Sequence, residues 1–141
     1  MLRSRFAIIL IIFTSAACEM GIDQMNAREM AIVREIQAIN TAQAQYVSQF
    51  GKFAGSMAEL GPPASGRAGA TAADLIPGNL ASGDKDGYIF TLAASPSGYS
   101  LKVNPKVYNS TAPRAFYSDQ NMIIHQNWSA EPANASSPEL R

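Results

Sequence analysis

The apolar residues between positions 23 and 50 recur on one side of a helix. Their spacings of three, four and seven residues are typical of an amphipathic helix with one buried face. These residues are Ile32, Ile36, Ile39, Tyr46 and Phe50, with Val33 and Val47 beside them. Asp23 suits an N-cap and Gly51 suits a C-terminal stop, so we predict a helix from about Asp23 to Phe50.

The polar residues of this segment are expected to lie mostly away from the apolar side. They are Arg28, Glu29, Arg34, Glu35, Gln37 and Gln45. Because only one side is apolar, the helix needs a partner surface to be stable.

After Gly87 the apolar period changes from helical to alternating. The alternating residues are Tyr88, Phe90 and Leu92, and, after a turn at residues 94–98, Tyr99, Leu101 and Val103. Two further strands, Arg114–Ser118 and Met122–Gln126, are predicted on either side of a tight turn that contains Asp119 and Asn121. The sequence thus predicts an α+β fold, in which one long N-terminal helix packs on a four-stranded antiparallel β-meander.

The segment between helix and strands, residues 52–86, holds nine glycines and prolines, which favours turns over long elements. Two short helix starts are predicted within it, because Ser56 precedes Glu59 by three residues and Thr71 precedes Asp74 by three. Residues 61–70 between them are expected to be exposed and mobile. The end of the chain, residues 129–141, is rich in Ala, Ser and Pro and lacks aromatic residues, so we predict a disordered tail.

The N-terminal residues have the layout of an export signal. Arg3 and Arg5 precede an uncharged run from Phe6 to Cys18, and small residues lead up to Cys18, the only cysteine. As a helix, these 13 residues would extend about 20 Å, against about 30 Å for the hydrocarbon core of a bilayer. We predict a signal peptide over residues 1–17, cleavage after Ala17, lipid attachment at Cys18 and a tether over residues 18–22, followed by a domain over residues 23–128. Cleavage without lipidation and an uncleaved anchor are the alternatives.

Charge and composition argue against several functions. Without Arg3 and Arg5, nine basic residues face eleven acidic ones, so no basic field is available to bind nucleic acid. The single histidine, His125, lacks evident partners, and no catalytic constellation or cofactor motif is found, so an enzyme is not expected. Asp84 and Asp86 resemble part of a calcium loop but lack its remaining acidic ligands. They are weak metal candidates, and we expect a solvated turn there.

Three stretches resemble type IV pilin-like proteins and the pseudopilins of type II secretion. The stretch "INTAQAQYVSQFGKFAGSMAELG", residues 39–61, resembles the mid-helix and loop of that family. The stretches "LIPGNLASGDKDGYIFTL", residues 75–92, and "RAFYSDQNMII", residues 114–124, resemble its loop, first strand and closing hairpin. The resemblance implies a pilin-type headgroup that is exported across the inner membrane and has protein partners in a pilus or secretion apparatus.

The N-terminus differs from that family, whose basic leader ends in glycine and precedes a long apolar half-helix that carries a glutamate. We therefore expect a non-enzymatic, pilin-like lipoprotein of the cell envelope that is anchored in a membrane and faces the periplasm or the cell exterior. The alternatives are a minor pseudopilin inserted through an uncleaved N-terminal segment, and a small periplasmic binding domain or hydrolase.

Overall fold

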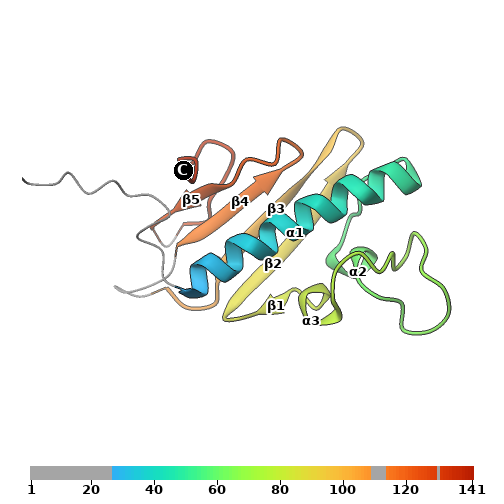
Figure 1. Ribbon diagram of the computed structural model, residues 1–141. Helices are drawn as coiled ribbons and strands as arrows, with labels where there is room; N and C mark the ends of the chain where they lie inside the picture. Colours follow the sequence, from blue (N-terminus) through green and yellow to red (C-terminus); the bar gives the residue numbers. More distant parts are fainter. Residues whose placement is uncertain (1–26, 109–113, 130) are drawn as a thin grey trace, which may run out of the picture.

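The computed structural model describes residues 27–108, 114–129 and 131–141 (Figure 1). In chain order its elements are α1 (Ala27–Phe50), α2 (Met57–Leu60), α3 (Gly78–Ala81), β1 (Asp84–Lys85), β2 (Tyr88–Ser95), β3 (Gly98–Pro105), β4 (Ala115–Asp119) and β5 (His125–Asn127). The helix prediction is confirmed from Ala27 to Phe50, and its proposed start at Asp23 lies outside the described residues.

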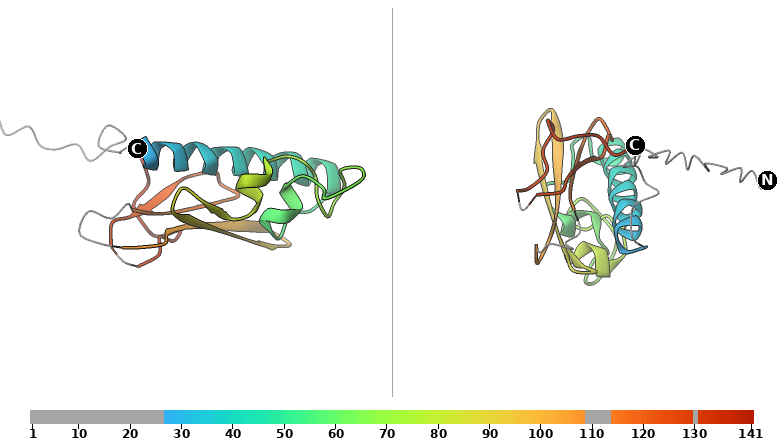
Figure 2. Two further views of the ribbon diagram at one scale, coloured as in Figure 1. Left: turned by 90° about the horizontal axis from the view of Figure 1, so that it is seen from below. Right: turned by 90° about the vertical axis from the view of Figure 1, so that its left-hand side faces the viewer.

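The five strands form one antiparallel sheet in the order β1-β2-β3-β4-β5, and α1 lies across one of its faces (Figures 1 and 2). The predicted α+β class is therefore confirmed, but the predicted count of four strands is wrong. The additional strand, β1, has two residues, which is too short for an alternating pattern to be recognised.

The last predicted strand is also displaced. Met122 and Ile123 are exposed and belong to the turn after β4, in which Met122 adopts φ +62°, and the paired residues begin only at His125. Asp119 and Asn121 form this turn as predicted, since the Asn121 amide donates to Asp119 Oδ1 over 2.9 Å.

The core lies between α1 and the sheet. Its members from α1 include Ile32, Ile36, Ile39 and Tyr46, all with no exposed surface. Its members from β2, β3 and β4 are Tyr88, Phe90, Leu92, Tyr99, Leu101, Val103 and Phe116. The predicted inward faces of the helix and of the first two long strands are thus confirmed.

Two polar residues in the second half of α1, Asn40 and Gln43, are buried among these apolar ones. Asn40 Nδ2 donates to Ser118 Oγ over 2.9 Å, and Tyr99 Oη donates to Asn40 Oδ1 over 2.8 Å. The Gln43 amide exchanges two hydrogen bonds of 2.9 Å with the backbone of Ala54. Because each bond requires one position along α1, together they fix where the helix sits on β3, β4 and the following loop.

The helix ends follow local sequence rules only in part. Gly51 ends α1 with φ +71°, and its amide donates to Val47 O over 2.9 Å, as predicted. Ser56 caps α2 by accepting from the Glu59 amide over 3.3 Å, while the Glu59 carboxylate accepts from Gly55.

The predicted helix start at Thr71 is wrong. Residues 69 and 72 form an isolated bridge, and Asp74 adopts φ +57°, which is incompatible with an α-helix. The amides of Ala73 and Leu75 instead donate to Glu59 O and Leu60 O over 2.8 Å, so this segment runs alongside α2. Tertiary pairing therefore overrides the capping pattern there.

The prediction of a disordered tail differs from the structure. Residues 137–140 run along β5, where the amide of Gln126 donates to Pro138 O over 2.9 Å and that of Leu140 to Ile124 O over 2.8 Å. Leu140 also packs against the core. This segment is held by backbone hydrogen bonds, which leave no apolar pattern in the sequence, so its composition did not indicate that it is ordered.

Replacing Asn40 with alanine should destabilise the domain more than its helical position suggests. The Tyr99 hydroxyl would lose its acceptor and Ser118 its donor inside the core, so we expect the free energy of unfolding to fall by about 1–3 kcal/mol. Urea unfolding measures this change. The exposed Gln45→Ala on the same helix is the control, and its expected change is below about 0.5 kcal/mol. Equal effects of the two substitutions would show that Asn40 does not position the helix.

Candidate functional site

A cluster of buried polar groups lies at the start of α1. Arg114, immediately before β4, has no exposed surface, and Glu29 in the first turn of α1 is 3% exposed. The Arg114 amide and Nε both donate to Glu29 Oε1, over 3.0 and 3.3 Å. The pair therefore joins the first turn of the helix to the beginning of a central strand.

Three further side chains surround this arginine. Its Nη1 donates to Gln126 Oε1, and its carbonyl oxygen accepts from Tyr88 Oη over 3.2 Å. Its Cζ lies 3.6 Å from the ring centroid of Trp128, a cation–π contact with a ring that is half exposed. Burial raises the pKa of Tyr88, and the Glu29 charge raises it further, so the phenol remains a neutral donor at neutral pH.

The geometry of this cluster favours a structural clamp over a catalytic centre. Arginine stays protonated and cannot serve as a base, and its partner carboxylate is used for two hydrogen bonds to it. Nη2 is buried and has no hydrogen-bond partner among the described residues, so part of the cost of removing the guanidinium from water is not offset.

The sequence pattern alone does not indicate this cluster. Glu29 was expected to point away from the apolar side, although it lies three residues before Ile32 and therefore on the same stripe. The burial of Glu29 corrects the prediction that this residue lies on the polar side of the helix. Helical spacing could have indicated the position of Glu29, but only the tertiary fold brings Arg114 to it.

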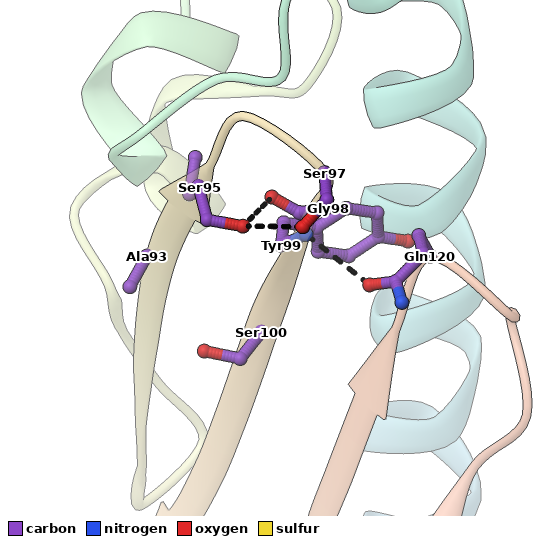
Figure 3. Close-up of a pocket in the computed structure, with 8 residues that line it drawn as sticks. Ala93, Ser95, Ser97, Gly98, Tyr99, Ser100 and Gln120 are labelled. Carbon is purple, nitrogen blue, oxygen red and sulfur yellow. Dashed lines mark hydrogen bonds between the residues drawn. The ribbon is translucent and has the colours of Figure 1, made fainter.

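The second candidate is a shallow hollow of about 320 Å³ at the turn between β2 and β3 (Figure 3). It is lined by Ala93, Ala94, Ser95, Ser97, Gly98, Tyr99, Ser100 and Gln120. Gln120 lies over Gly98, where a Cβ would overlap its amide, and accepts from the Tyr99 amide over 3.3 Å.

The lining of this hollow offers little chemistry. Its polar groups are serine hydroxyls, the Gln120 amide and backbone atoms, and its single ionisable side chain, Tyr99, directs its hydroxyl to Asn40 in the core. A serine nucleophile needs a neighbouring base, and none lines the hollow. The site therefore suits weak polar contact rather than a reaction.

The two weak metal candidates lie at the β1–β2 hairpin. Asp84 pairs with Lys106, with 2.5 Å between Oδ2 and Nζ, and Asp86 forms the turn with φ +53° beside Gly87 at +83°. Across residues 27–108, 114–129 and 131–141, no group of three His, Cys, Asp or Glu side chains is arranged to hold a metal ion. His125 is half-buried under the tail, where its Nδ1 lies 2.7 Å from Ser137 O.

The predicted cleavage site at Ala17 and lipid site at Cys18 lie outside the described residues. Within the part of the chain that is described, no helix combines the length and apolar character needed to cross a membrane. Comparison with protein-family models, with curated proteins and with solved structures found no match.

If the Arg114–Glu29 pair holds α1 to the sheet, substituting Arg114 should lower the free energy of unfolding. Arg114→Met removes the guanidinium that pairs with the buried Glu29 carboxylate, so we expect a loss of about 3–5 kcal/mol in the free energy of unfolding. Adding Glu29→Gln to Arg114→Met removes the buried negative charge and should restore part of the loss. Chemical unfolding of the two single variants and the double variant measures the coupling.

Lys102→Met on the exposed side of β3 is the matched control, with an expected change below about 0.5 kcal/mol. If Arg114→Met were as mild as this control, the cluster would not hold α1 to the sheet.

Proposed function

We propose that the chain is a pilin-like lipoprotein without enzymatic activity, which acts as an accessory or interaction module of a type IV pilus or type II secretion-like system. The observation that carries the proposal is the position of α1. The helix lies across an antiparallel sheet, and its described start at Ala27 follows Cys18 by nine positions, where a short apolar run ends.

The positions of the three pilin-like stretches support this proposal. Residues 39–61 cover the second half of α1, the loop and α2, residues 75–92 cover α3, β1 and the first half of β2, and residues 114–124 cover β4 and its turn. The resemblance implies a mid-helix and loop, then a loop and first strand, then a closing hairpin, and this order of one helix followed by strands supports the proposal. The short elements α2, α3 and β1 are additional to it.

The polar groups of the domain support a role in binding rather than catalysis. The buried ion pair is engaged in holding α1, and the hollow at the β2–β3 turn has no base beside its serines. The face of the sheet opposite α1 carries no helix among the described elements (Figure 2). Side chains on that face, such as Ile89 at 39% exposure, are available to a protein partner.

The tether is tested by the intact mass of the native protein extracted from membranes. We expect a chain that begins at Cys18 and carries the added mass of acyl chains, whereas Cys18→Ser should yield no acylated form. Met20→Ala, two residues further along, is the control and should keep the lipid. A full-length mass that includes Met1 would instead favour the uncleaved pseudopilin, and a cleaved chain without acyl mass would contradict the lipoprotein.

A further inference from the structure

Three exposed apolar side chains lie at the end of the domain where α1 begins. They are Met30 in the first turn of α1, Val107 after β3 and Trp128 after β5, which are 37%, 67% and 50% exposed. We refer to these three residues as the basal face. Single exposed apolar side chains are ordinary on a protein surface, so these three are of interest because they lie at the same end of the domain.

A chain of contacts places these residues around the same end. Trp128 stacks on Arg114, which bonds to Glu29, the neighbour of Met30 in α1. The Lys106 amide donates to Gly87 O over 2.9 Å and places Val107 beside the β1–β2 turn. Gly87 and Arg28 in turn line one hollow, so the turn lies against the start of α1.

The length of chain before α1 limits how far this end can lie from the lipid anchor. The nine steps from Cys18 to Ala27 extend about 30 Å when fully stretched. The 24 residues of α1 add about 36 Å before the opposite end of the domain is reached. The exposed residues Met122 and Ile123 lie at that opposite end, after β4.

We propose that the basal face rests on the phospholipid surface, with Trp128 and Val107 in the head-group region. This inference rests on the proposed lipid anchor at Cys18. Tryptophan is enriched at membrane interfaces because its apolar ring and its N–H group suit the two sides of that boundary. Asp86 lines one hollow with Arg28, and Lys106 pairs with Asp84, so the charges near this end are balanced and the contact should depend weakly on salt.

Trp128 is the only tryptophan in the chain, so its fluorescence reports on the basal face alone. The mature lipidated protein, which begins at Cys18, is reconstituted in vesicles of phosphatidylethanolamine and phosphatidylglycerol. A second set of vesicles also contains a phosphatidylcholine that is brominated near the head-group end of its chains. We expect a blue-shifted emission that the brominated lipid quenches by about half or more, as for an interfacial tryptophan. Aqueous iodide should quench the same emission weakly.

Substitutions at two exposed positions test whether the basal face, and not another part of the surface, contacts the membrane. Val107→Asp places a charge in the contact and should reduce the quenching by brominated lipid at least twofold. Ile123→Asp, at the opposite end, is the matched control and should leave it unchanged. Both positions are at least 40% exposed, so the fold is expected to tolerate either change.

The mass of the reconstituted protein distinguishes failure of this inference from failure of the proposed function. A lipidated protein whose Trp128 is quenched by iodide and not by brominated lipid would overturn the membrane contact and leave the anchor intact. That result would also leave the basal face free for a protein partner. A protein without acyl chains on Cys18 would overturn the anchor, and the membrane contact with it.

Discussion

The fold depends on the burial of one side of α1 against the sheet. The helix is apolar on one side only, and the inner face of the sheet is covered by that side together with Met57, Leu60, Ile76 and Leu80 from the segment after α1. We therefore expect neither the helix nor the sheet to be stable alone. Apolar packing supplies most of the stabilisation but allows the helix to slide by a turn. The buried bonds of Asn40 and Gln43 remove that freedom, since they are satisfied at one position only.

The same interface explains why the two ends of the domain differ. At the start of α1 a buried arginine joins helix, β4 and β5, and its stacking partner Trp128 extends to the surface. At the far end the contacts are the loop bonds of Gln43 and small serine-lined turns. The end that follows the proposed anchor thus combines a buried ion pair with the exposed ring of Trp128, whereas Met122 and Ile123 are exposed at the opposite end.

The sequence was informative where burial has a regular period. The inward faces of α1, β2 and β3 could be predicted, because their apolar residues repeat every three to four or every two positions. Short β1, the displaced β5 and the tail at Leu140 are held by backbone pairing with little apolar period, so they could not be predicted. Arg114 and Glu29 are 85 residues apart in sequence, and no local pattern links them. The candidate site was therefore the part least accessible to prediction.

The central claim is that α1 and the sheet form one cooperative unit. Native-state hydrogen exchange tests it most directly, because it reports the free energy of opening at each amide. We predict that the amides of Ile36 and Ile39 in α1 and those of Leu101 and Val103 in β3 open with free energies equal within about 0.5 kcal/mol, at the value for global unfolding. An opening free energy for the α1 amides several kcal/mol below that of β3 would mean that the helix detaches from an independently stable sheet, and would contradict the account.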